Sequence, residues 1–176
     1  PLTSSGLSSF YAGRFDDQMH FSGSLLKVAA LFAAGQFHAE AKAFAVGYTV
    51  WTKFVQDFNA ALKTEVNATA DSRILTYTPS AGMSLMPNTE AILKKTAFPT
   101  ITFTDGFEGS LGRMIVQSSE ADSAICIRAL GYAYINNAPT KAKLLKTPTP
   151  GTWLGGARGL DSYRPTPVDA LPPHAQ

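Results

Sequence analysis

Two stretches in the first half of the chain carry apolar residues at every third or fourth position, which is the pattern of an amphipathic α-helix. The first stretch starts after Ser24 and is predicted to end at Gly35, because glycine often follows the last helical residue. Its apolar positions are Leu25, Val28, Ala29, Leu31 and Phe32. The second stretch spans 39–66, with Gly47 as the expected point of division. Its predicted buried face consists of Phe44, Tyr48, Trp51, Val55, Phe58 and Leu62.

The second half of the chain alternates between short helices and extended segments. Asn88 and Glu90 predict a short helix over 88–97, because an asparagine cap and an early acid suit a helix start. The elements expected after it are an extended piece at 99–104, a turn at Asp105-Gly106, a helix from about Ser110 and another that stops at Gly131.

These patterns predict one α+β domain over 1–176, in which helices dominate and strands are few. Residues 1–9 are small and polar and are expected to form a loose lead-in. Residues 139–176 are rich in proline and glycine, without a helical period, and are expected to be irregular. A chain of 176 residues is long enough to bury a substantial core.

Composition narrows the classes of function. A hydrophobic fraction of 45% excludes disorder of the whole chain, and a net charge of +2 without a basic run indicates no nucleic-acid partner. The densest basic group, Lys141, Lys143 and Lys146, is interpreted as a solvated edge. No apolar stretch reaches the roughly 18 residues of a membrane span. The chain begins at Pro1 without a signal-peptide pattern, as a trimmed form or a fragment would.

Metal and disulfide chemistry find no support in the sequence. The single cysteine, Cys126, lies among apolar neighbours, which favours a buried, inert thiol and excludes an internal disulfide. The histidines, His20, His38 and His174, do not have the spacing of metal ligands. We therefore predict no metal and no cofactor.

Ser24 and Lys27 are the first candidates for chemistry. If Ser24 opens a helix, Lys27 lies one turn further on the same face, within reach of the serine oxygen. A serine hydroxyl needs an adjacent base to act as a nucleophile, and a desolvated lysine amine can supply one. The alternative is a capping serine followed by a solvated lysine, which many helix starts contain.

A second segment gives the pair a context. The stretch "HFSGSLLKVAALFAA" followed by "MIVQSSEADSAICIRALG" resembles the penicillin-recognising serine hydrolases, which include serine β-lactamases and D-alanyl-D-alanine peptidases. The resemblance covers residues 10–138 and aligns Ser118 with the serine, and Glu120 with the asparagine, of the S-x-N motif. It implies that Ser24 is the acylated nucleophile, Lys27 the general base and Ser118 a proton relay. Tyr132 is a further candidate for contact with substrate, although a turn after Gly131 explains it equally well.

Two departures from that family affect the expected site. Glu120 places a carboxylate where the family has a neutral amide, and a carboxylate that pairs with a lysine weakens the lysine as a base. The third motif, K-T-G, has no clear counterpart, because Lys146-Thr147-Pro148 lies close after Ser118 and ends in proline instead of glycine. The resemblance thus implies the helical region of that fold with an incomplete antiparallel sheet. Truncation, completion by a second chain or oligomer, and divergence remain open explanations.

Three functions are consistent with these observations. The first is a serine hydrolase that forms an acyl-enzyme through Ser24 and acts on a small-molecule or peptide substrate with an amide, ester or β-lactam bond. The second is a non-catalytic module that keeps this scaffold and binds peptidoglycan fragments, another protein or a second chain. The third is an unrelated helical domain with accidental motifs. The family resemblance implies an extracytoplasmic location, periplasmic or secreted.

Overall fold

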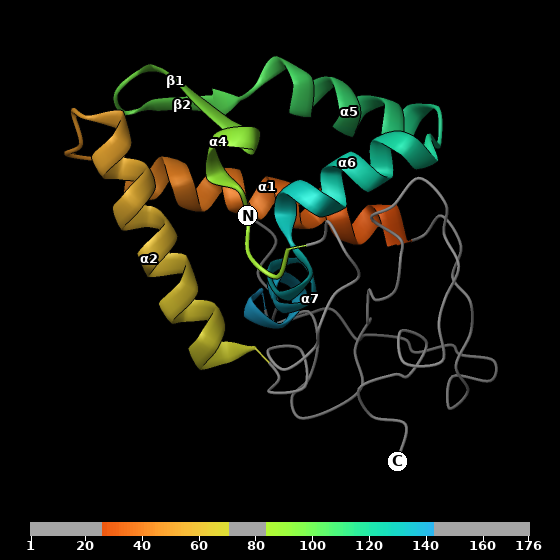
Figure 1. Cartoon of the computed structure of the whole chain (residues 1–176), viewed down its shortest axis with the longest axis horizontal. Coiled ribbons are helices and arrows are strands. Elements are labelled where there is room, and N and C mark those ends of the chain that lie inside the picture. Colours follow the sequence, from red (N-terminus) through yellow and green to blue (C-terminus); the bar gives the residue numbers. More distant parts are fainter. Residues whose placement is uncertain (1–25, 71–83, 143–176) are drawn as a thin grey trace, which may run out of the picture.

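The computed structural model describes residues 26–70 and 84–142 of the chain. Helices dominate this part, and the described strands form one two-stranded antiparallel sheet, so the predicted helix-rich α+β class is confirmed (Figure 1). The elements are α1 (Leu26–Phe44), α2 (Trp51–Thr69), α4 (Thr89–Ile92), β1 (Leu93–Ala97), β2 (Thr100–Phe103), α5 (Asp105–Val116), α6 (Glu120–Leu130) and α7 (Tyr132–Lys141). Within the described residues, no helix is both long enough and apolar enough to cross a membrane.

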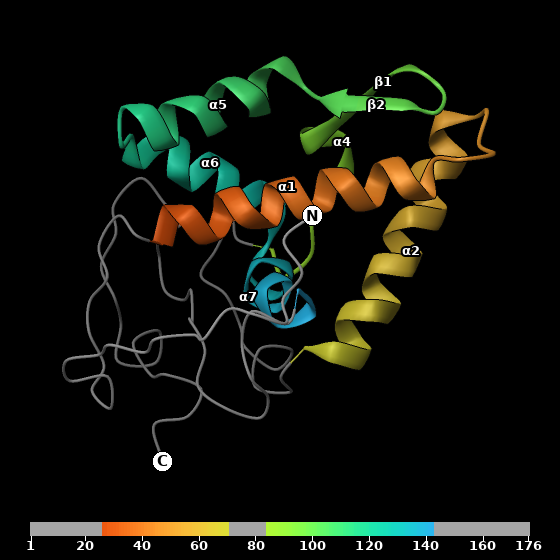
Figure 2. The same cartoon turned by 180° about the vertical axis from the view of Figure 1, so that it is seen from behind.

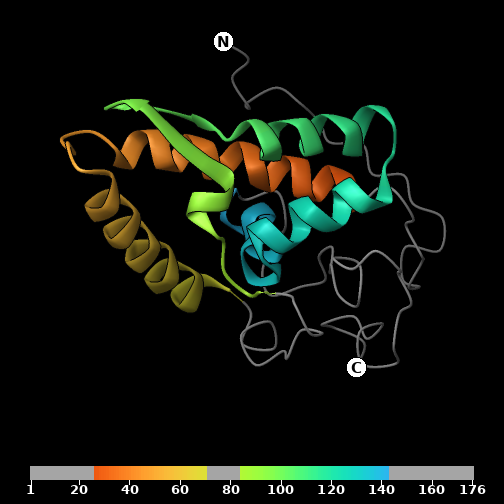
Figure 3. The same cartoon turned by 45° about the horizontal axis from the view of Figure 1, so that its top comes forward.

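Helix α1 is the central element of the fold. It contacts α5, α6, α7 and β2, and Figure 2 shows it lying across the molecule between the hairpin with α5 on one side and α7 on the other. Helix α2 leaves the end of α1 and contacts α7. Figure 3 shows the first turns of α1 alongside the turn from α5 to α6. This arrangement brings the start of α1 close to residues almost a hundred positions later in the chain.

The buried face of α1 differs from the predicted one. Lys27, Ala30, Ala34, Phe37 and Ala41 are buried at helical spacing, whereas the predicted core residues Val28 and Leu31 are 58% and 38% exposed. Small alanine side chains let neighbouring helices approach closely, because the distance between helix axes depends on the residues at the contact. The predicted stripe is therefore only partly buried, since Ala29 and Phe32 pack against the core whereas Val28 and Leu31 face outward.

The predicted end of the first helix at Gly35 is wrong, because α1 continues through Gly35 to Phe44. Alanine-rich sequence favours the helix strongly enough to accept one glycine, which costs about 1 kcal/mol relative to alanine. The division at Gly47 is confirmed, since Gly47 has φ +88° in the turn between α1 and α2.

The predicted stripe of the second helical region faces the core, and its members Phe58 and Leu62 are buried. The other four pack against the core half-buried; they are Phe44, Tyr48, Trp51 and Val55. The pattern missed two buried residues of α2, Phe54 and Val66. Phe54 and Phe58 stack with ring centroids 5.4 Å apart, and Phe44 of α1 packs against both rings. Aromatic contacts of this kind join the two helices at the end of the molecule away from Lys27.

Residues 88–104 confirm the predicted extended piece, which is β2, and correct the predicted helix before it. Asn88 caps α4 by accepting a hydrogen bond from the Ala91 amide, but the helix ends at Ile92 and the predicted second half is strand β1. Strand β1 pairs with β2, so cross-strand hydrogen bonds decide the structure of a segment whose local signals favour a helix.

The turn predicted at Asp105-Gly106 is the first turn of α5. Thr104 caps this helix by accepting from the Phe107 amide, and Asp105 and Glu108 add acids to its positive end. The expected helix therefore starts five residues earlier than Ser110.

Helix α6 ends at Gly131 as predicted, but the next segment is a helix and not a turn. Helix α7 runs to Lys141, so the irregular segment predicted from 139 onwards does not begin there. Residues 84–88 cross over this junction, where the amides of Tyr132 and Ala133 donate to the carbonyls of Ser84 and Leu85. Gly131 makes the crossing feasible, since a Cβ there would lie 2.6 Å from the Leu85 carbonyl oxygen.

Candidate functional site

Lys27 of α1 lies in a buried contact with the turn between α5 and α6. Its side chain is 3% exposed, and its Nζ lies 2.9 Å from Ser118 Oγ and 2.6 Å from the Ser118 carbonyl oxygen. A third contact of 2.8 Å joins Lys27 Nζ to Glu120 Oε1. The structure thus brings together three of the residues that the sequence singled out.

These three contacts match the three N–H donors of a lysine ammonium. A buried charge is costly unless it is paired and hydrogen-bonded, and here a carboxylate, a carbonyl and a hydroxyl all face the amine. A neutral Lys27 amine could instead accept the Ser118 hydroxyl proton. The same geometry therefore suits both a structural ion pair and a proton relay.

Ser118 adopts a left-handed backbone conformation with φ +53°, the one non-glycine residue in the described part to have a positive φ. Such a conformation costs a non-glycine residue about 1–2 kcal/mol and is found most often at turns and functional sites. It lies just after α5, and Ser119 then caps α6 by accepting from the Asp122 amide. This backbone conformation directs the carbonyl oxygen and Oγ of Ser118 to the same Lys27 amine.

Glu120 begins α6 with a half-exposed side chain, 53% accessible, while its partner Lys27 is buried. The first turn of a helix favours an acid, so the position is stable without any catalytic role. Compared with the amide expected from the family, the carboxylate adds a negative charge at the amine.

Ser24 lies outside the described residues, so its contacts are not part of the site as described. Tyr132, at the start of α7, is 1% exposed and packs in the core, and this structural role is enough to explain a large side chain at that position. Its contact with a substrate stays a prediction. Lys146-Thr147-Pro148 also falls outside the described residues.

Sequence reasoning missed the residues that hold the Ser118 turn. Arg113 of α5 donates through Nε to both carboxylate oxygens of Asp122, at 3.2 and 3.1 Å, and through one terminal nitrogen to Oδ1 at 2.7 Å. Hydrogen bonds from Arg113 and with Ser119 hold the pKa of Asp122 well below its usual range. An arginine and an aspartate nine residues apart carry no helical spacing signal, because a turn separates them.

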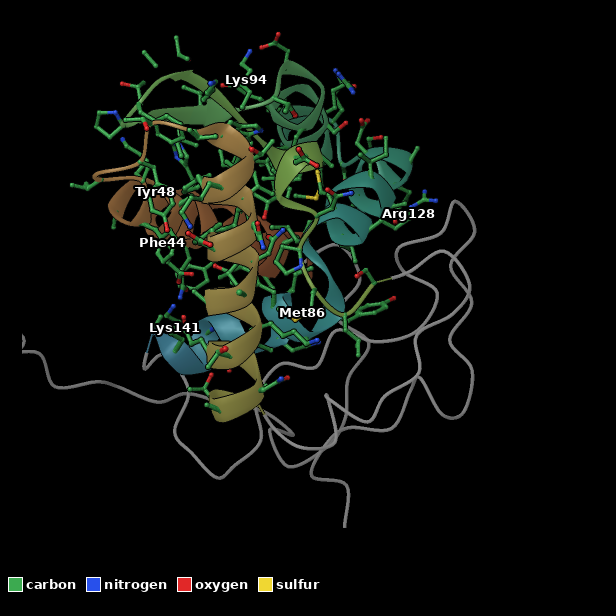
Figure 4. The ribbon with its side chains drawn as sticks, turned by 60° about the vertical axis from the view of Figure 1, so that its left-hand side comes forward. Phe44, Tyr48, Met86, Lys94, Arg128 and Lys141 are labelled. Atoms are coloured by element: carbon green, nitrogen blue, oxygen red, sulfur yellow. The ribbon has the colours of Figure 1, made fainter. Side chains whose placement is uncertain are left out.

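A second polar group lies at the other end of α1. Lys141 Nζ pairs with Glu40, at 2.7 Å, and with Glu65, and the Tyr134 hydroxyl donates to Glu40 at 3.2 Å. A cavity of about 380 Å³ borders this group; its lining is Glu40, Ala43, Phe44, Phe58, Ala61, Leu62, Glu65 and Lys141. Figure 4 shows Phe44 and Lys141 on the same side of α2.

This second group is remote from Lys27 and corrects one prediction. Glu40 and Lys27 are separated along α1 by roughly 20 Å, from the 1.5 Å rise per residue. Lys141 is not a solvated edge residue, since its side chain is 30% exposed and tied to two carboxylates. Burial alone would lower the pKa of Lys141, but the hydrogen bonds and charges of Glu40 and Glu65 outweigh it and raise the pKa.

Cys126 is fully buried in α6, and burial raises the pKa of its thiol to about 12. The thiol therefore stays protonated and unreactive near neutral pH, as its apolar neighbours predicted. Across 26–70 and 84–142, no three histidine, cysteine or acidic side chains gather in a way that could hold a metal ion. His38 instead contacts the carbonyl of Ile101 at 2.9 Å.

Comparisons of this chain with known protein families, with curated proteins and with solved structures gave no match. The resemblance to the penicillin-recognising hydrolases stays a prediction from two short motifs.

Proposed function

We propose that the protein is a serine acyl hydrolase of the penicillin-recognising type, with Ser24 as nucleophile, Lys27 as general base and Ser118 as proton relay. The observation that supports this best is the 2.9 Å contact between Lys27 Nζ and Ser118 Oγ, made by residues 91 positions apart. Two motifs that lie far apart in the chain but resemble one family's site are expected to meet if the resemblance is real. The proposed fold is the helical region of that family.

The proposed reaction begins with transfer of the Ser24 hydroxyl proton to a neutral Lys27 amine. Ser24 Oγ forms a bond to the substrate carbonyl carbon, and the bond from that carbon to the leaving nitrogen or oxygen breaks. The proton passes from Lys27 through Ser118 Oγ to the leaving group. Water then hydrolyses the ester at Ser24, releases the acid and restores the serine hydroxyl. Amide, ester and β-lactam substrates all fit this sequence.

A second candidate function is a non-catalytic module that binds peptidoglycan fragments, a protein or a second chain. The observation that favours it is the ion pair between Lys27 and Glu120, because the Glu120 carboxylate, 2.8 Å from the amine, gives Lys27 a structural partner where the family has a neutral amide. We propose an extracytoplasmic location for either function, on the family resemblance alone.

Labelling with fluorescent penicillin and with a fluorophosphonate separates the two functions. We expect both reagents to label the wild type, Ser24→Ala to abolish labelling, and Ser118→Ala to slow it by about 10²-fold or more, the size of a lost proton-transfer group. Ser84→Ala is the matched control, because Ser84 is exposed and its hydroxyl bonds within its own turn.

Two outcomes would reject catalysis through Ser24. Equal labelling of the wild type and Ser24→Ala would place the nucleophile elsewhere. An intact mass without any adduct after prolonged incubation would favour the binding module.

A further inference from the structure

The turn that presents Ser118 to Lys27 is held from both sides by one ion pair. Arg113 lies five residues before Ser118 on α5, and Asp122 lies four residues after it on α6. Their side chains meet across the turn through three N–H···O contacts of 2.7 to 3.2 Å. Arginine can grip a carboxylate with two nitrogens at once, which fixes orientation as well as distance.

The backbone of the same two residues also fixes the turn. The Arg113 carbonyl accepts from the amides of Gln117 and Ser119, at 3.0 and 3.3 Å, and the Asp122 amide donates to Ser119 Oγ at 3.2 Å. The amides on both sides of Ser118 are thus held by the Arg113 backbone carbonyl, while the Ser119 side chain is held by the Asp122 amide. Its positive φ is a conformation that relaxes unless its surroundings enforce it.

We propose that Arg113 and Asp122 are positioning residues for Ser118. Their ion pair fixes the α5–α6 turn so that the Ser118 hydroxyl and carbonyl both face the Lys27 amine. The pair acts on Lys27 through the turn. The effect on acylation rests on the proposed function, whereas the effect on the environment of Lys27 does not.

An ordinary surface ion pair on the same helix provides the comparison. Asp105, the first residue of α5, pairs with Lys94 of β1 at 2.5 Å, with side chains that are 90% and 44% exposed. Figure 4 shows Lys94 on the hairpin. Asp122, in contrast, is only 11% exposed, and its ion pair spans two helices. Exposed pairs usually contribute little to a structure.

The test compares Asp122→Asn with Asp105→Asn in the full chain, with two measurements on each. The first is the rate at which an activated ester acetylates the Lys27 amine in the folded protein. This rate is measured by peptide mass spectrometry after digestion. We expect slow modification in the wild type and Asp105→Asn, and at least a fivefold faster rate in Asp122→Asn. The second is the rate constant of serine labelling by fluorescent penicillin, separated from the affinity for the reagent. We expect the rate constant to fall about 10- to 100-fold in Asp122→Asn, because the Ser118 hydroxyl would no longer be held in position. The affinity for the reagent is expected to stay unchanged.

The two measurements separate failure of this proposal from failure of the proposed function. An unlabelled wild type with faster Lys27 acetylation in Asp122→Asn rejects the hydrolase and supports the positioning role. A labelled wild type with unchanged rates of both kinds in folded Asp122→Asn overturns the positioning role. If Asp122→Asn does not fold by circular dichroism, Arg113→Lys, which keeps the charge but loses the two-pronged contact, serves in the same comparison and is expected to give an intermediate rate.

Discussion

At the scale of single residues, Gly131 is the glycine, among those that the structure describes, whose backbone geometry and packing leave the least room for a side chain. It has φ +77° and ψ 146°, which is a glycine conformation, and a Cβ there would meet the Leu85 carbonyl at 2.6 Å. We expect Gly131→Ala to lower the free energy of unfolding by about 1–3 kcal/mol, measured by urea denaturation.

Gly35 is the matched control for this substitution. It lies inside α1 with open space around it, so Gly35→Ala is expected to raise the free energy of unfolding by about 0.5–1 kcal/mol. A Gly131→Ala variant as stable as the wild type would contradict the crossing of 84–88 over the α6–α7 junction.

The candidate site shows what residue-level reasoning can reach. No local sequence pattern links positions as far apart as Lys27 and Ser118. Their contact is expected only because the two motifs that contain them resemble the motifs of one family. The positive φ of Ser118 has no sequence signal, since glycine or asparagine is the usual residue there. The grip of Arg113 on Asp122 depends on how a turn folds back, which periodicity does not report.

At the scale of elements, local signals are reliable where the backbone of the residue itself requires a cap or a glycine turn, and Gly35, which has no such requirement inside α1, is not a helix end. Gly47, Asn88 and Gly131 act where the sequence predicts, because caps and glycine turns are determined by their own backbone. The buried face of α1 and the strand β1 are set by partners elsewhere in the chain. Tertiary contacts therefore decide the features that periodicity and capping signals do not predict.

Helix α2 begins without a side-chain cap, and this gives a prediction at the element scale. Val50 is its N-cap, with the extended backbone that capping residues adopt, a side chain that accepts no hydrogen bond and 54% exposure. No acid lies in the first turn. We expect Val50→Asp to raise the free energy of unfolding by about 1 kcal/mol, because aspartate can accept from a first-turn amide and faces the positive helix end.

Val46→Asp tests whether the gain comes from capping. Val46 is 72% exposed in the same connection but does not directly precede the helix, so its replacement is expected to change stability by less than about 0.5 kcal/mol. The midpoint of urea unfolding, at an unchanged slope, reports both effects. Equal shifts for the two variants would show that removal of an exposed valine, and not the cap, is responsible.

At the scale of the whole molecule, Lys141 joins the three helices that form the end of the fold remote from Lys27. It lies on α7 and pairs with Glu40 of α1 and Glu65 of α2, beside the buried Tyr134. Replacement by methionine keeps much of the length of the side chain and leaves two carboxylates without this cation. We expect Lys141→Met to lower the free energy of unfolding at pH 7 by about 1 kcal/mol. The effect is this small because Lys141 is partly exposed, and solvent screens its ion pairs.

The pH dependence identifies the charge as the cause. The pKa of Lys141 is raised in the folded protein, so its contribution is complete below the unfolded lysine pKa of about 10.4 and is lost as the pH rises through the higher folded pKa. The stability difference between wild type and Lys141→Met should therefore be equal at pH 7 and 9 and shrink towards pH 12. Tyr134→Phe in both backgrounds removes phenol ionisation, because burial also raises the pKa of Tyr134. Lys63→Met, on the exposed side of α2, is the control and should not change the stability at any of these pH values. If the stability difference for Lys141→Met persists at pH 12, packing of the lysine stem, and not its charge, holds these helices together.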